Sequence, residues 1–463
     1  MNDSAAQFSK WKVLLIALTL VLGISAGVSF WLIPSLSMYA PFVILGCFGV
    51  FVTVLMGFSK PALFTYITLF IILLPTDLIP ANLNSQLNRL ATILAFFFWM
   101  INAFDKKKPF ILTVSSGFMI LFLMWSAFSL TWVNNFDEGF TALQVYALRF
   151  ILFLLVIPNV IHSKKDLQEM MKVIVFSGVL LIFVSIKTVL QGYTVGTRLQ
   201  VLNVNENAIG MNLLLSVFAA IWLEQNSELK HKNLFIFLTA IFLLASIAIT
   251  GLSGSRGSAI SWGISILIIT FFKPTRRWGT FSLLIIAVAA LFVPSIFTTT
   301  IERFLVVQGD TALGGREFLW PAALRLIKDH FFLGVGIGNS QFEMVPYLLV
   351  SGARTVMRSG EPIHNPILVI WAETGIIGLA MYLGILGSVL VSFLKNWKNS
   401  ISIDGQTHNS YFPIMAAVAI GFLSSWIKGG GMESSFTFFL LISILLSSSV
   451  LVSNTPSMKK END

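Results

Sequence analysis

The chain has 463 residues, of which 56% are hydrophobic and 11% are charged, whereas an ordinary soluble domain has roughly 25% charged residues. This composition excludes a soluble globular protein. The formal net charge of +9 would suggest a nucleic-acid partner for a soluble protein, but in a membrane chain the positions of the basic residues matter more than their sum, so we expect no nucleic-acid partner. The single cysteine, Cys47, excludes an intramolecular disulfide.

The apolar residues fall in runs of roughly 20, the length that crosses a hydrocarbon core of about 30 Å. We therefore predict an all-α, polytopic integral membrane protein with about 12–14 transmembrane helices. The predicted spans are residues 13–33, 39–57, 61–79, 89–104, 109–130, 140–161, 168–190, 207–223, 233–250, 259–272, 279–297, 366–391, 411–427 and 434–452. The first is too long for a signal-peptide core, so we expect it to be an uncleaved span.

Basic residues gather on alternate connections between the predicted spans. This set holds 17 of the 30 Lys and Arg residues: Lys10, Lys12, Lys60, Lys106, Lys107, Lys108, Lys164, Lys165, Lys230, Lys232, Lys273, Arg276, Arg277, Lys395, Lys398, Lys459 and Lys460. The positive-inside rule places these connections and both termini in the cytoplasm. The other connections then face outward.

The whole chain, residues 1–463, is predicted to form a single membrane domain. It divides into N-terminal transmembrane helices over 13–297, one large outer loop over 298–363, and C-terminal transmembrane helices over 366–452. A loop of this length is usually functional. Within it, residues 315–332 carry apolar side chains at helical spacing and charged ones on another side. We expect an amphipathic helix there, lying at the outer membrane interface.

Arginines dominate the charge on the outer side. Arg198, Arg256, Arg303, Arg316, Arg354 and Arg358 all lie at or beyond the outer ends of predicted spans. A guanidinium stays protonated and presents a fork of donors suited to phosphate oxygens, so several converging on one cavity would bind a polyanion such as a lipid-linked pyrophosphate. The alternative is that some reach lipid headgroups or pair with neighbouring glutamates. The functional interpretation is stronger for Arg256 and Arg316, which lie in glycine-rich turns.

His364 stands where the outer loop re-enters the membrane, in EPIHNPILVIWAETGIIG. A neutral imidazole there could take a proton from an acceptor hydroxyl, although a lone histidine is more often structural. The glycines of FFLGVGIGNSQF follow a predicted helix rather than a strand, which argues against a dinucleotide-binding loop. No metal-binding or nucleotide-binding motif occurs in the sequence, so we expect neither a metal site nor a cofactor.

The motifs of the second half resemble those of the O-antigen ligase and Wzy-type polysaccharide polymerase superfamily. That pattern is Gly-Arg followed by Trp, a Gly-x-Gly turn, His-Asn, and Glu-Thr-Gly opening the next span. The matching residues here are Gly315, Arg316, Trp320, Gly334, Gly336, Gly338, His364, Asn365, Glu373, Thr374 and Gly375. Upstream, Arg198 with Asn205 and Asn207 resembles an Arg followed by Asn-Pro-Asn, with Glu206 in place of the proline. The motif-bearing resemblance covers about residues 198–386.

The resemblance implies an inverting, metal-independent glycosyltransferase of the GT-C type in the bacterial inner membrane, with its active site facing the periplasm. Its donor would be a glycan on undecaprenyl pyrophosphate, and its acceptor would be a sugar hydroxyl of a lipid-linked repeat or of a lipid A core. Arg256 and Arg316 would stabilise the leaving pyrophosphate and His364 would deprotonate the acceptor. We expect substrate-binding roles for Arg198, Asn207, Arg303, Trp320, Asn365 and Glu373. Glu373 would orient a neighbour or serve as a buried partner for an arginine.

Polymerase and ligase share the donor and differ in the acceptor. The length of the chain slightly favours a polymerase of O-antigen, capsule or exopolysaccharide over an O-antigen ligase. An alternative from another class is a transporter or flippase of lipid-linked oligosaccharide, but carboxylates within the predicted spans are scarce and no internal repeat is visible. A peptidoglycan glycosyltransferase of the SEDS type fits the His-Asn and Gly-Arg-Trp pattern poorly.

Overall fold

The computed structural model describes residues 61–74, 81–105, 111–192, 198–199, 206–228, 231–305, 316–350, 362–401, 410–426 and 435–452. Helices account for nearly all of this, and no strand occurs within these ranges. The predicted all-α, polytopic fold is therefore confirmed. The first two predicted spans, residues 13–33 and 39–57, lie outside the described residues.

Each of the other twelve predicted spans coincides with a helix or a run of helices. These elements are α3 (Pro61–Leu73), α4 (Ala81–Asp105), α5 (Val114–Ser129), α6 (Phe136–Phe150) with the π-helical η3 (Ile151–Val156) and α7 (Ile157–Val160), α8 (Lys164–Leu190), α9 (Glu206–Asn226), α10 (Lys232–Leu252), α11 (Arg256–Phe271), α12 (Arg276–Phe292), α17 (Pro366–Ser400), α18 (Tyr411–Trp426), and α19 (Phe436–Leu446) with the 3-10 helix η6 (Ser447–Leu451). Apolar runs of this length satisfy their backbone polar groups within the helix, as a bilayer requires.

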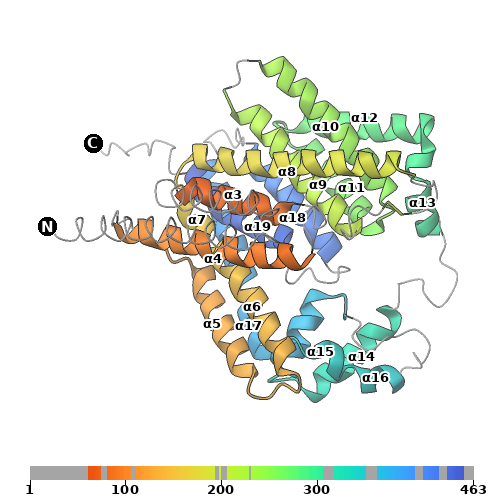
Figure 1. Ribbon diagram of the computed structural model, residues 1–463. Coiled ribbons are helices and arrows are strands. Elements are labelled where there is room, and N and C mark those ends of the chain that lie inside the picture. Colours follow the sequence, from red (N-terminus) through yellow and green to blue (C-terminus); the bar gives the residue numbers. More distant parts are fainter. Residues whose placement is uncertain are drawn as a thin grey trace, which may run out of the picture.

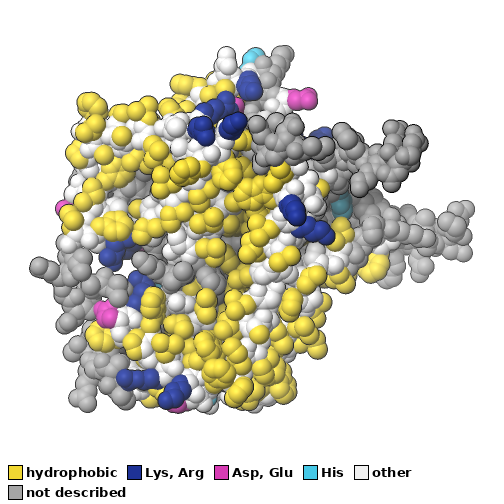
Figure 2. Space-filling model, turned by 180° about the vertical axis from the view of Figure 1, so that it is seen from behind, with side chains coloured by type: hydrophobic (Ala, Val, Ile, Leu, Met, Phe, Trp, Pro, Cys, Tyr) yellow, Lys and Arg dark blue, Asp and Glu magenta, His cyan; other side chains and the backbone are white. Residues whose placement is uncertain are grey.

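Six of the described helices are long and apolar enough to cross a membrane: Ser85–Phe104, Phe136–Val160, Lys164–Leu190, Glu206–Asn226, Lys232–Leu252 and Pro366–Ser400. Shorter apolar helices, such as α11 and α18, pack closely against each other. Hydrophobic side chains cover much of the face shown in Figure 2, and charged side chains there are few and lie mostly near its edges. This surface is typical of a protein that faces lipid.

Helix α9 is the buried centre of the bundle. Of its most apolar window, 78% is buried, compared with 44% for α10 and 33% for α8. It packs against α8, α10, α11 and α18. Close approach depends on small residues: a Cβ at Gly178 of α8 would lie 2.4 Å from the Cβ of Ser216, and a Cβ at Gly210 would lie 2.4 Å from that of Ser258. Small residues at such contacts let helix backbones approach closely in membranes.

Four shorter helices lie between α12 and α17 in the sequence: α13 (Thr298–Leu305), α14 (Arg316–Asp329), α15 (Ser340–Glu343) and α16 (Val345–Val350), with the 3-10 turn η4 (Pro294–Ile296) before α13. In Figure 1, α14, α15 and α16 gather at one end of the molecule beside α17 and the ends of α5 and α6. Helix α13 instead lies at the edge of the other group, beside α11.

Helix α14 buries its apolar side against protein. Leu319, Ala322, Ala323, Leu326 and Ile327 are each at most 3% exposed. Their partners come from α16, from the first turns of α17, and from the glycine-rich segment after α14, which contains Gly334, Gly336 and Gly338. Together these residues form a second hydrophobic core separate from that of the main bundle. The amphipathic pattern seen in the sequence is therefore satisfied by packing of α14 on α16 and α17.

Candidate functional site

The turn between α10 and α11 builds the first part of the site. Ser255 caps the N-terminus of α11, since its Oγ accepts a hydrogen bond from the backbone N–H of Ser258. The same Oγ donates to Oδ1 of Asn207 at 2.5 Å, and the Oγ of Ser258 donates to the backbone oxygen of Asn207 at 3.1 Å. The N-terminus of α9, with Asn207, is thereby fixed against the first turn of α11.

Arg256 and Arg303 hold each other in place through the backbone. Nη1 of Arg256 donates to the carbonyl oxygen of Arg303 at 3.1 Å, and Nη1 of Arg303 donates to the carbonyl oxygen of Gly254 at 2.9 Å. Thr300 also donates from Oγ1 to the carbonyl oxygen of Gly251 at 2.9 Å. Helix α13 is thus bound to the turn that carries Arg256.

Arg198 joins the same turn from the segment before α9. Its Nε donates to the carbonyl oxygen of Ser253 at 3.4 Å, and its Nη1 lies 3.2 Å from Oε1 of Glu206. Gly254 has a positive φ of 62°, and a Cβ there would lie 2.8 Å from Thr299 and 3.4 Å from the side chain of Arg198. Glycine at this position therefore permits both the turn and the close approach of α13 and Arg198.

The charges of four arginines act on one another at this place. Burial lowers the pKa of the Arg303 guanidinium, and the positive charges of Arg198 and Arg256 lower it further. Glu206 opposes this shift, and Arg316 adds to it. The pKa of Arg316 is likewise lowered by burial and by the charge of Arg256. The structure therefore brings together four of the arginines that the sequence singled out, from four different segments of the chain.

A second group of predicted residues lies where α14 meets the start of α17. Nε1 of Trp320 on α14 donates to the carbonyl oxygen of Ile363 at 3.2 Å. The next residue, His364, has a φ of 57°, a left-handed conformation that non-glycine residues rarely adopt and that often occurs at functional sites. Asn365 then caps α17, because its Oδ1 accepts from the backbone N–H groups of Ile367 and Leu368.

Glu373 lies farther along α17 than its cap Asn365, at a kink in the helix. Its side chain is 6% exposed, and Oε1 accepts a hydrogen bond from Oγ of Ser340 at 2.8 Å. Two residues later, Gly375 has a φ of 66° and interrupts the helix. The glycine-rich segment binds to this kink, because the N–H of Gly336 donates to the carbonyl oxygen of Glu373 at 2.8 Å. Glu373 thus anchors the outer segment to α17.

The predicted site residues therefore fall into two groups that α14 connects. Arg198, Asn207, Arg256 and Arg303 surround the α10–α11 turn, while Trp320, His364, Asn365 and Glu373 follow the contact of α14 with α17. Arg316, the first residue of α14, interacts electrostatically with Arg256 and Arg303 of the first group. Arg354 and Arg358 lie outside the described residues.

Two contributors were missed at the level of sequence, Ser255 and Ser340. Ser255 could have been found, because a serine just before a helix start is typical of an N-cap. Ser340 carried no signal, since its contact with Glu373 spans 33 residues. No group of three or more His, Cys, Asp and Glu side chains that could hold a metal ion occurs in the described part of the chain.

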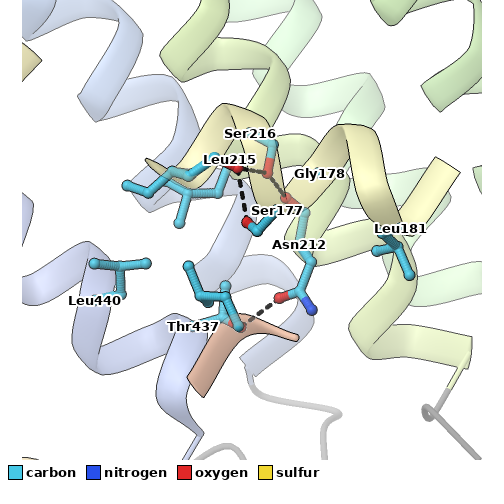
Figure 3. Close-up of a pocket in the computed structure, with 10 residues that line it drawn as sticks. Ser177, Gly178, Leu181, Asn212, Leu215, Ser216, Thr437 and Leu440 are labelled. Carbon is cyan, nitrogen blue, oxygen red and sulfur yellow. Dashed lines mark hydrogen bonds between the residues drawn. The ribbon is translucent and has the colours of Figure 1, made fainter. Parts of the chain in front are cut away.

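A small cavity lined by both polar and apolar side chains lies elsewhere in the bundle, between α3, α8, α9 and α19. Figure 3 shows Thr437 donating to Asn212, with Ser177, Gly178 and Ser216 beside them. The space that a water-sized molecule can occupy inside it corresponds to about one water molecule. The cavity is too small for a sugar or a pyrophosphate, and its hydrogen bonds hold neighbouring helices together.

Comparison with known proteins gives matches over most of the chain. Residues 240–383 match a family model described as O-antigen ligase, and residues 42–223 match a model described as a family of unknown function. A Rickettsia conorii protein named "Putative polysaccharide ligase" is 24% identical over 379 residues, which cover 77% of this chain and 86% of that protein. An uncharacterized protein of Haemophilus influenzae is 26% identical over 183 residues, which cover 36% of this chain and 45% of that protein.

These matches confirm the resemblance to the O-antigen ligase and Wzy-type superfamily. The O-antigen ligase model covers the segment that holds Arg256, Arg303, Arg316, Trp320, His364 and Glu373. Together with the apolar helices, the match indicates a multi-pass membrane protein that is similar to the O-antigen ligases over residues 240–383.

Proposed function

Because residues 240–383 match the O-antigen ligase family, we propose that this protein is a membrane-bound glycosyltransferase that transfers a glycan from undecaprenyl pyrophosphate to an acceptor sugar hydroxyl. The observation that carries the proposal is the cluster of Arg198, Arg256 and Arg303 at the α10–α11 turn, with Arg316 at the start of α14 within electrostatic range of it. Like charges brought together without a ligand repel one another. A site that accepts this cost suits a polyanion such as pyrophosphate.

The arginines would act on the leaving group. In the reaction, the acceptor oxygen forms a bond to the anomeric carbon while the bond from that carbon to the pyrophosphate oxygen breaks, and the electron pair leaves with the pyrophosphate. Arg256 and Arg303 are held in advance by backbone carbonyls, so little rearrangement is needed to meet the developing charge. Their guanidinium groups supply charge and bidentate donors without a proton transfer.

His364 would act on the acceptor. Its imidazole would take the proton of the attacking hydroxyl as the new glycosidic bond forms. The left-handed backbone of His364, the Trp320 bond to Ile363 and the Asn365 cap fix this residue at the entry of α17. Attack on the side opposite the pyrophosphate would invert the anomeric carbon. We propose that arginines replace a metal ion in this GT-C-type mechanism, with no cofactor.

The acceptor separates ligase from polymerase. The names of the matched family and of the Rickettsia protein point to ligation, whereas the length of the chain favours polymerisation. We propose a position in the bacterial inner membrane with both termini in the cytoplasm and the four arginines facing the periplasm. The reason is that the 17 basic residues on alternate connections mark the cytoplasmic side. A donor that is already activated as a pyrophosphate ester needs no ATP there.

A transfer assay with purified protein in lipid nanodiscs tests the proposal. The donor is undecaprenyl pyrophosphate carrying one repeat unit, and the two acceptors are purified lipid A core and a second lipid-linked repeat. Product on lipid A core identifies a ligase, and a dimeric repeat on the lipid identifies a polymerase. Activity should survive addition of EDTA. Absence of transfer to either acceptor, or strict dependence on a divalent ion, would count against the mechanism.

A further inference from the structure

Glu317, the second residue of α14, has a buried carboxylate with no donor. Neither Oε1 nor Oε2 is exposed to solvent, and neither accepts a hydrogen bond from any part of the chain that the structure describes. Its charge acts on the neighbouring Arg316, opposing the effects of burial and of Arg256 on that guanidinium. The first residues of α14 thus hold a carboxylate whose hydrogen-bonding capacity is unused.

The position of Glu317 relates it to His364. Residues three apart on a helix are neighbours on its surface, so Glu317 lies on the flank of α14 that carries Trp320. Trp320 donates to the carbonyl oxygen of Ile363, the residue directly before His364. Glu317 and His364 therefore lie on either side of one contact, the Trp320–Ile363 hydrogen bond, where α14 meets the entry of α17.

An unsatisfied buried carboxylate lowers the stability of a protein, and the hydrophobic core around α14 does not need Glu317 for its packing. Desolvation of a charge without a hydrogen bond destabilises a protein, whereas the apolar residues of α14 from Leu319 onward pack in a closed core. Carboxylate oxygens accept hydrogen bonds only. A partner for these oxygens must therefore bring donors, which the pyrophosphate and the apolar polyprenyl chain lack and the hydroxyl groups of a sugar supply.

We propose that Glu317 binds the acceptor sugar by accepting a hydrogen bond from a hydroxyl next to the one that attacks. This inference rests on the proposed function. Glu317 would make no covalent bond and would take no proton, since the proton of the attacking hydroxyl goes to His364. It would select acceptors, because a site built to bind a hydroxyl discriminates strongly against an analogue that lacks it.

The test compares full-length wild-type protein with Glu317→Gln and Glu317→Leu in nanodiscs, using the donor and whichever of the two acceptors the wild type accepts. Glu302→Gln on α13 is the control, because Glu302 is an exposed glutamate of the same outer segment. For Glu317→Leu we expect the KM for the acceptor to rise roughly 10- to 100-fold, with the KM for the donor unchanged. Glu317→Gln keeps one acceptor oxygen and should lose less.

Two further readouts separate binding from a structural role. The melting temperature of Glu317→Leu should stay close to that of the wild type, because the gain from removing an unsatisfied buried carboxylate is offset by the loss of its negative charge beside Arg316. A series of acceptors, each lacking one hydroxyl, should contain one that the wild type uses much less well than the complete acceptor. Glu317→Leu should use that acceptor and the complete acceptor equally well. The inference is overturned by an unchanged KM for the acceptor, by a change confined to the donor, or by a lower melting temperature in both variants. Failure of the wild type to transfer any glycan would instead overturn the proposed function.

Discussion

Arg256 and Arg303 each donate a hydrogen bond to the backbone of the segment that carries the other. The two distances are 3.1 Å to the carbonyl oxygen of Arg303 and 2.9 Å to that of Gly254. Each guanidinium therefore has an orientation that depends on both segments. A substitution at either arginine should disturb the other.

Arg256→Ala and Arg303→Ala should each lower kcat/KM for the lipid-linked donor by roughly 10²- to 10³-fold, the usual loss when one preorganised donor is removed. The double variant should lose less than the product of the two single losses, because each residue positions the other. Transfer kinetics measured at several donor concentrations check both statements. Lys172→Ala, at an exposed residue of α8, should behave as the wild type.

Arg316→Lys should retain part of the activity that Arg316→Ala loses. An ammonium keeps the positive charge beside Arg256 but cannot reproduce the bidentate fork of a guanidinium. We expect Arg316→Lys to restore activity at least tenfold over Arg316→Ala while remaining about tenfold below the wild type. Equal activity of the lysine and arginine proteins would show that charge alone matters at this position.

Substitutions at His364 can separate its imidazole from its backbone. His364→Gly and His364→Asn both tolerate a φ near 57°, so they should fold and insert normally while losing transfer activity. His364→Ala should lose activity and some stability as well, by about 1 kcal/mol, because alanine does not favour this conformation. Thermal unfolding and the transfer assay on the three proteins test this. A fully active His364→Asn variant would remove the histidine as the base.

Gly375→Ala should destabilise the protein strongly. Gly375 has a φ of 66°, and a Cβ there would lie 2.0 Å from the carbonyl oxygen of Phe332, so we expect a loss of about 2 kcal/mol or more. Gly387→Ala in the same helix is the matched control, since a Cβ there meets nothing within 4 Å and should stabilise the helix by about 0.5–1 kcal/mol. Melting temperatures of the two variants should therefore move in opposite directions.

Trp320→Phe should keep an aromatic ring, though a smaller one, and lose the hydrogen bond to Ile363. Because that bond fixes the residue before His364, we expect kcat to fall about fivefold to tenfold, the value of one neutral hydrogen bond. Trp132→Phe is the control. It also loses an indole hydrogen bond to a backbone carbonyl, that of Gly334 at 3.3 Å, but Trp132 belongs to neither of the two groups of predicted site residues. It should change stability and leave kcat close to that of the wild type.

Most of the fold was predictable because membrane helices are recognised in a sequence by the length and the hydropathy of their apolar runs. The predicted span at 168–190 became α8, Lys164–Leu190, and the span at 233–250 became α10, Lys232–Leu252. The environment of α14 was less accessible. Its apolar stripe predicts an apolar surrounding, but an amphipathic pattern alone cannot distinguish the interior of a lipid layer from the side chains of α16 and α17.

The site was predictable in its residue types and not in its connections. Arginines at the outer ends of spans indicated an anion site, and four of them come together. The bonds that fix Arg256 and Arg303 end on backbone carbonyls, which leave no trace in residue identity. The positive φ of His364 was equally hidden, because glycine and asparagine are the residues that usually mark that conformation. Glu317 became notable only when its lack of donors was visible.

The burial of α9 has a consequence for how the chain enters the membrane. This helix has a mean hydropathy of 1.4, whereas its sequence neighbours α8 and α10 each reach 2.5. A segment that is only moderately apolar partitions weakly into lipid by itself. Synthesis delivers α8 before it and α10 directly after it, so α9 can be sheltered between two strongly inserting neighbours until the bundle closes. Biogenesis of the arginine site, whose Asn207 and Glu206 begin α9, therefore depends on helices α8 and α10, which carry none of its arginines.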